Sequence, residues 1–154
     1  MIPAVTVGRL RGQLDCLPIL LQNLDDGALE KRPIPGKWSA RENLAHLARY
    51  HEIFLQRLDR ILNEDCPNLG RYSAEDDVEW PRWFLLPADQ VLSRMRELRA
   101  RLIQRIESLS SAEASRSGTH SRFGRMSLVE WLEFFLLHEA HHLMIVLQRS
   151  RQTP

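Results

Sequence analysis

Apolar residues recur at steps of three and four residues in four stretches of the chain, which is the period of an amphipathic helix. The stretches cover about residues 5–24, 39–62, 88–109 and 128–147. No stretch shows a convincing alternation of the kind that marks a half-buried strand. Four amphipathic helices of this length pack most simply against one another, so we predict an all-α four-helix bundle formed by a single domain, residues 1–154.

Local signals indicate where these helices begin and bend. Residues 39–42 read SARE and residues 127–130 read SLVE, and each is a capping box that predicts a helix start. Pro87 is favourable in the first turn of the third helix. Pro18 lies inside the first apolar stretch, where it predicts a kink or a broken turn.

The connectors between the helices are long, about 11 to 22 residues, so simple up-and-down order is not forced. The connector over residues 65–86 contains Tyr72, Trp80, Trp83 and Phe84 among acidic residues. A loop of this length and aromatic content is typical of a lid or pocket wall. The alternative is that the connector only covers one end of the bundle, and we slightly favour this interpretation. The two roles are compatible.

Composition and charge describe an ordinary globular protein, with 44% hydrophobic residues, 27% charged residues and a net charge of +1. Such a charge gives no strong field for nucleic acid or an anionic membrane. No apolar run approaches 18 residues, and Cys16 and Cys66 are isolated, which argues against a disulfide framework. We expect a soluble cytoplasmic domain with neither nucleic acid nor membrane as a partner.

Residues 138–142 read HEAHH, which fits the H-E-x-x-H pattern of zinc proteases. Those enzymes take a third metal ligand from further along the chain and set the helix against a sheet. The sequence after residue 142, LMIVLQRSRQTP, contains no His, Asp or Glu. We therefore exclude a protease of this type.

The histidine pair itself still indicates a metal site. His138 and His142 are four residues apart, so both imidazoles project from one face of the helix and can chelate one divalent ion. Burying two unpartnered imidazoles in so apolar a helix is costly, which favours a metal over mere packing. A third ligand could be His46, His51 or His120. On a helical wheel the apolar face of the second helix centres near His51, with His46 about 120° away, so the wheel alone favours His51.

Three segments of the chain resemble the DinB/YfiT-like family. PIPGKWSARENLAHLARYHEIF (residues 33–54) is similar to the family's proline-and-tryptophan turn and the helix that follows it. FGRMSLVEWLEFFLLHEAHHLMIVLQ (residues 123–148) resembles its last helix, with a glycine turn and H-x-x-x-H. NEDCPNLGRYSAEDDVEW (residues 63–80) is similar to the linker of the YfiT-like branch. The resemblance covers most of the chain in matching order.

The resemblance implies a four-helix bundle that binds one divalent metal through three histidines. By position, the implied ligands are His46, His138 and His142. This overrules the helical wheel, because a ligand must face a pocket at the rim of the bundle and not its packed seam. We expect four further side chains near the ion or in the pocket wall: His51, Glu139, Trp83 and Tyr72. Glu139 could orient an imidazole through its second ring nitrogen, and His141 is expected to point elsewhere.

Three imidazoles leave a coordination position open, where metal-bound water acquires a pKa towards about 7. Imidazole suits several ions, of which we favour zinc or nickel. The resemblance implies either metal-dependent hydrolysis or transfer with a low-molecular-weight thiol as cofactor. Four arginines near the motifs could hold the carboxylate of such a cofactor: Arg41, Arg49, Arg122 and Arg125.

Two classes of function follow from these observations. The favoured one is a metal-dependent enzyme, a hydrolase or thiol S-transferase, acting on a small molecule. The other is a non-catalytic bundle that binds metal or a ligand, since no nucleophile motif and no obvious general base are present. The resemblance also makes a homodimer plausible. DNA binding is disfavoured by the near-neutral charge.

Overall fold

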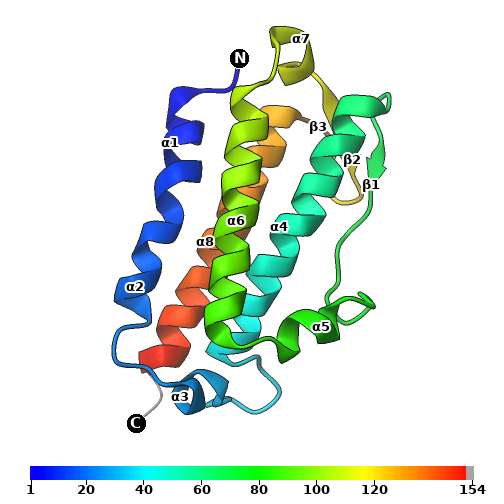
Figure 1. The fold of residues 1–154 in the computed structure, drawn as a ribbon. Helices are drawn as coiled ribbons and strands as arrows, with labels where there is room; N and C mark the ends of the chain where they lie inside the picture. The colour runs from blue at the N-terminus through cyan, green and yellow to red at the C-terminus, as the bar shows by residue number, and fades with distance from the viewer. Residues whose placement is uncertain (152–154) are drawn as a thin grey trace.

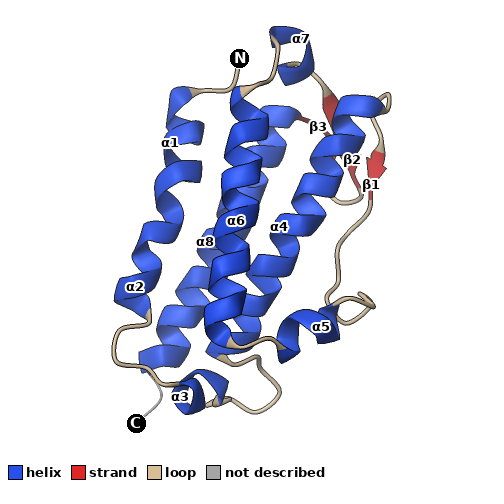
Figure 2. Ribbon diagram, viewed as in Figure 1, coloured by secondary structure: helices blue, strands red, loops and turns tan. Residues whose placement is uncertain are grey.

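The computed structural model describes residues 1–151, and four long helical segments form its framework (Figures 1 and 2). These are α1 (Ala4–Gly12) with η1 (Gln13–Cys16) and α2 (Leu17–Leu20), then α4 (Ala40–Asn63), α6 (Ala88–Glu107) and α8 (Leu128–Arg151). Three short helices lie between them: α3 (Asp26–Glu30), α5 (Trp80–Leu85) and α7 (Ser111–Ala114). The predicted four-helix bundle is confirmed. No helix among these residues combines the length and apolar composition needed to cross a membrane.

The order of the helices in space explains the longest connector. Following the colours of Figure 1, α4 and α6 run in the same direction, whereas α1 and α8 run in the opposite one. The chain therefore returns along the outside of the bundle between residues 64 and 87 before α6 begins. Parallel neighbours need such a crossover, so the bundle is not a simple up-and-down one.

The helix boundaries follow the local signals. Ser39 caps α4, its hydroxyl accepting the Glu42 backbone N–H at 3.1 Å while the Glu42 carboxylate accepts the Ser39 N–H at 2.8 Å. Ser127 and Glu130 make the same reciprocal pair at the start of α8. The first helical segment is interrupted by a 3-10 turn, and Pro18 lies in the first turn of α2, as predicted.

A small sheet, which was not predicted, packs at one end of the bundle. β1 (Asn68–Leu69) pairs parallel with β2 (Ser117–His120), which pairs antiparallel with β3 (Gly124–Ser127). The expectation that the chain holds no strand was wrong, because strands of two to four residues are too short to show an alternating pattern. Gly124 has a φ of 72°, which suits the left-handed turn between β2 and β3.

One close contact fixes the sheet against the bundle. The Trp131 indole on α8 donates to the carbonyl of Gly118 in β2 at 3.2 Å. A Cβ at position 118 would lie 3.1 Å from the Ile61 side chain of α4, closer than an ordinary van der Waals contact, so glycine favours this close approach of the strand. The sheet is thereby held against α4 and α8, and its residue His120 is buried at a defined place.

Candidate metal centre

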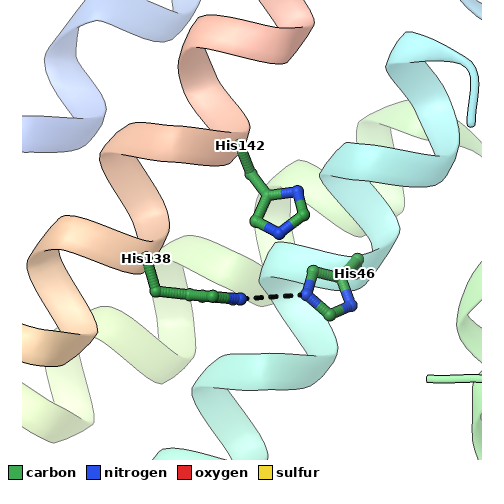
Figure 3. Close-up of side chains that lie close together, drawn as sticks. All are labelled: His46, His138 and His142. Carbon is green, nitrogen blue, oxygen red and sulfur yellow. Dashed lines mark hydrogen bonds between the residues drawn. The ribbon is translucent and has the colours of Figure 1, made fainter. Parts of the chain in front are cut away.

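Three histidines from two helices meet on one side of the bundle. His46 comes from α4, and His138 and His142 come from adjacent turns of α8, which packs against α4. One ring nitrogen of each lies within 4.8 Å of the others, and the Nε2 atoms of His46 and His138 are 3.2 Å apart. Figure 3 shows the three rings turned toward a common space between the helices. The histidines carried over from the resemblance are therefore brought together.

His51, which the helical wheel favoured, lies elsewhere. Its side chain is 1% exposed, and its Nδ1 donates to the carbonyl of Leu47 while Nε2 accepts from Arg99. The wheel located the centre of the apolar face of α4 correctly. That centre faces the packed seam between helices, whereas the histidine cluster lies at the edge of the seam beside a cavity.

Burial keeps all three clustered imidazoles neutral. It lowers the pKa of His46 to about 4, of His138 to about 2 and of His142 to about 3. Electrostatic repulsion from the neighbouring imidazoles lowers the pKa of His138 further. At neutral pH each ring therefore keeps a free lone pair, as a metal ligand must, and the set of three nitrogen donors fits a divalent transition ion.

Asn43 orients one of these rings and was missed by sequence reasoning. Its Oδ1 lies 2.8 Å from Nδ1 of His142, while its Nδ2 donates to the Ser39 carbonyl at 2.7 Å. The amide oxygen therefore accepts a hydrogen bond from the Nδ1–H group, which leaves the lone pair of His142 Nε2 free to bind a metal. The available signal was its position, one helical turn before His46 on the same side of α4.

The other two rings are positioned by packing. Nδ1 of His46 and Nδ1 of His138 are buried and have no hydrogen-bond partner among the described residues. Instead, the ring centroid of His46 lies 5.0 Å from that of Trp38 and 5.6 Å from that of Tyr72. The ring centroid of His138 lies 4.1 Å from that of Tyr50. Aromatic walls thus fix ring orientations that elsewhere in proteins are set by hydrogen bonds.

A cavity of about 440 Å³ opens onto the three histidines. This volume suits a small molecule. Residues 71–75 of the long connector line one side, including Tyr72, and residues 120–123 of the β2–β3 turn line another. The connector thus forms part of the pocket wall, so the slightly favoured interpretation, a packed cover alone, was wrong.

An ion pair tethers this connector to the helix that carries His46. The Arg49 Nε donates to Asp77 at 2.6 Å, and both side chains are at most 10% exposed. The Tyr72 hydroxyl donates to the same carboxylate at 2.9 Å. Burial works to raise the pKa of Asp77, but the hydrogen bonds from Arg49, the Glu79 backbone and Tyr72 outweigh it and lower the pKa. The ion pair of Arg49 and Asp77 therefore holds Tyr72 in place against the His46 ring.

Glu139 and Trp83 take no part in the pocket, contrary to expectation. The Glu139 carboxylate is fully buried and is bound by Arg99 and by Gln13 at 2.8 Å, so it does not orient a ring of the cluster. Burial raises the pKa of Glu139, opposed by the charge of Arg99. Trp83 is 4% exposed and packs in the core, with its indole donating to Glu52. His51 belongs to the buried group around Arg99, so of the four expected side chains only Tyr72 lines the cavity.

Arg122 is the one of the four suggested arginines that lines the cavity in the described part of the chain. The other three bond to protein groups outside it: Arg41, Arg49 and Arg125. Arg57 and Arg71, which the sequence did not single out, also line the cavity. His141 directly precedes His142 and so projects about 100° away from it around the axis of α8, and it is exposed, as expected.

The fold and the histidine cluster agree with a family assignment. Residues 9–146 match the model of the DinB superfamily, and the chain belongs to that family. A protein of Oceanobacillus iheyensis is 26% identical over 148 residues, which cover 92% of this chain and 84% of the relative. A protein of Bacillus mycoides is 25% identical over 122 residues, 79% of this chain and 70% of the relative. Both carry the name "putative metal-dependent hydrolase".

Two solved structures share the fold. YfiT from Bacillus subtilis superposes with a TM-score of 0.80 at 20% identity, over 96% of this chain and 85% of YfiT. It is described as "a probable metal-dependent hydrolase with an unusual four-helix bundle topology". The four-helix bundle protein TT2238 superposes with a TM-score of 0.65 at 22% identity, over 92% of this chain and 94% of TT2238.

Proposed function

We propose that this protein is a metal-dependent hydrolase that holds one divalent ion on His46, His138 and His142. The observation that carries the proposal is the convergence of three neutral imidazoles at the wall of a cavity large enough for a small substrate. No further His, Cys, Asp or Glu of residues 1–151 joins the group, so the site would keep an open position. The names of the two curated relatives and of YfiT support the same class of reaction.

The chain's own residues would divide the work of hydrolysis. When bound, a zinc or nickel ion supplies Lewis acidity and lowers the pKa of a coordinated water. Asn43 holds the His142 ring so that Nε2 faces the site. Glu75 is the one carboxylate that lines the cavity among the described residues, and its charge acts on His46. We assign Glu75 the role of accepting a proton from the attacking water.

Transfer to a low-molecular-weight thiol is the second candidate. The same open position would bind a thiol as its thiolate, and Arg122 in the cavity wall supports binding of a carboxylate on such a cofactor. Hydrolysis ranks first because the relatives bear that name.

Metal content tests the proposal directly. The purified protein, loaded with zinc or nickel and desalted, should retain about one ion per chain. His46→Ala and His138→Ala should each lose it, whereas His141→Ala, which removes an exposed histidine of the same helix, should retain it. A wild type that binds neither zinc nor nickel would contradict the proposal and favour a non-catalytic bundle. Hydrolysis of a panel of small esters and amides should then require the ion and fall in Glu75→Gln.

A further inference from the structure

Arg57 is a buried cation that lacks a counter-charge in the described part of the chain. The residue is 7% exposed and lines the cavity beside the three histidines. Its Nη1 donates to the Tyr50 hydroxyl at 2.9 Å and its Nη2 to the Gly70 carbonyl at 2.6 Å. Both partners are neutral, and Arg57 takes part in none of the ion pairs found among residues 1–151. Its guanidinium also lies over the rings of Tyr50 and Trp131, at 5.7 and 5.5 Å. A buried charge is normally paired with an opposite one, so Arg57 is suited to bind an anion from the cavity.

The same cavity contains a hydrogen-bond donor of defined orientation. His120 is 6% exposed, and its Nδ1 accepts the backbone N–H groups of Arg122 at 3.0 Å and Phe123 at 3.3 Å. With Nδ1 as the acceptor, the proton of the neutral ring resides on Nε2. Burial lowers the pKa of His120, and the charges of Arg57 and Arg122 lower it further, so the ring is neutral at pH 7.

The Nε2–H group of His120 is available to a ligand. It makes no hydrogen bond with any described residue, and His120 lines the cavity. The ring is held by Phe123 and Phe134, whose centroids lie 4.9 and 5.3 Å away. The Arg122 guanidinium stacks over Phe123 at 5.6 Å, which places a positive charge next to His120.

Charge around the cavity is predominantly positive. Three arginines line it, Arg57, Arg71 and Arg122, against one carboxylate, Glu75, among the described residues. The three clustered histidines are neutral and therefore leave this charge balance unchanged. Arg57 is close enough to His120 and to His138 for its charge to lower the pKa of both rings. A concave site lined by one sign of charge concentrates ligands of the other sign.

We propose that the cavity binds a substrate with an anionic group, a carboxylate or a phosphate, which is received by Arg57 and by the Nε2–H of His120. Arg122 and Arg71, both exposed, attract the anion at the mouth. The reacting bond of the substrate then lies toward His46, His138 and His142. This inference deepens the proposed hydrolase function and rests on it for catalysis, but anion binding can be measured without turnover.

Binding of simple anions to the metal-free protein tests the inference separately from metal chemistry. Glutarate, inorganic phosphate and the neutral glutaramide are titrated calorimetrically at constant ionic strength. We expect at least one anion to bind and glutaramide not to bind. Saturation by glutarate alone identifies a carboxylate-bearing substrate, and saturation by phosphate alone a phosphate ester. The bound anion should also raise the Tm, as a ligand of the folded state does.

Three variants locate the bound anion. Arg57→Gln removes the buried charge, His120→Phe keeps the ring packing but removes the donor, and Arg122→Gln removes the exposed charge. We expect affinity to fall about ten- to hundred-fold for Arg57→Gln and His120→Phe, as loss of a charge-assisted hydrogen bond implies, and less for Arg122→Gln. Arg125→Gln is the matched control, since this exposed arginine bonds to Ser117 outside the cavity. Circular dichroism checks that each variant is folded.

The outcomes separate this inference from the proposed function. The inference is wrong if neither anion binds, or if binding is unchanged in both Arg57→Gln and His120→Phe. Either result would overturn it even where zinc binding and hydrolysis of neutral esters are intact. If anions bind as expected but no metal does, the inference holds for a binding site and the hydrolase proposal fails. With both intact, kcat/KM for the p-nitrophenyl ester that carries a free glutarate carboxylate should exceed that for p-nitrophenyl butyrate, and Arg57→Gln should remove the preference.

Discussion

The amide of Asn43 and the ring of His142 form a 2.8 Å hydrogen bond between α4 and α8. The bond joins the two helices that contribute the histidine cluster, and it fixes the tautomer of His142 with Nε2 free. Because the same amide is anchored to the Ser39 carbonyl, it cannot rotate to offer its NH₂ group instead. The first turn of α4 therefore controls the chemical state of a ring on another helix.

Replacing Asn43 should weaken metal binding without removing any histidine. In Asn43→Leu the His142 ring loses its orienting partner, and we expect zinc affinity to fall about 10- to 100-fold, the usual cost of losing such a partner. Competition with a chromophoric chelator measures this. Asn63→Leu, an exposed asparagine on the same helix, should leave the affinity unchanged. Equal zinc affinities of wild type and Asn43→Leu would show that the bond does not position the ligand.

The buried ion pair of Arg99 and Glu139 should matter for stability. Arg99→Met leaves a fully buried carboxylate without its cation, which typically costs about 3–5 kcal/mol in the free energy of unfolding. Urea unfolding followed by circular dichroism measures the loss. The exposed Arg96→Met on the same helix should change stability by no more than about 0.5 kcal/mol. Adding Glu139→Leu to Arg99→Met should recover much of the loss, because no unpaired charge is then buried.

Acid should destabilise the metal-free protein in the range where free histidines titrate. Unfolded histidines take up protons near pH 6.5, whereas folded His46, His138 and His142 do so only near pH 4 or below. The unfolded state therefore binds more protons between these values, and the free energy of unfolding should fall as pH decreases from about 7 to 5. Urea titrations of chelator-treated protein at several pH values measure this dependence.

The control for the pH dependence is His138→Phe. With one titrating group fewer, its slope should be shallower by up to about 1.4 kcal/mol per pH unit. Identical slopes for wild type and variant would mean that His138 has an ordinary pKa in the folded protein.

Releasing the connector from α4 should loosen the pocket wall. In Asp77→Asn the carboxylate that binds both Arg49 and Tyr72 loses its charge, so residues 71–75 should open more often. Limited trypsin cleavage after the exposed Arg71 should become several-fold faster. The Tm should fall less than in Arg99→Met, because Arg49 still pairs with Glu52 at 2.6 Å. Asp76→Asn alters the exposed neighbouring carboxylate and should be cleaved at the wild-type rate. Unchanged cleavage of Asp77→Asn would show that other contacts hold the wall.

The sequence by itself determined the elements that depend on local chemistry. Periodicity located the four long helices, and the capping boxes at Ser39 and Ser127 located the starts of α4 and α8. The spacing of His138 and His142 placed both on one helical face, because that geometry is intrinsic to the helix. The family resemblance pointed to His46, which local reasoning alone would have passed over for His51.

Only the tertiary structure decided which faces meet. Periodicity finds the apolar centre of a helix but not the rim where a cavity opens, so it favoured His51, which is buried beside Arg99. Asn43 bonds to a ring on another helix, Arg57 bonds to the Gly70 carbonyl in the long connector, and His120 lies on a strand too short to predict. Their roles arise from contacts between elements, and those contacts are set by how α4, α8 and the small sheet pack together.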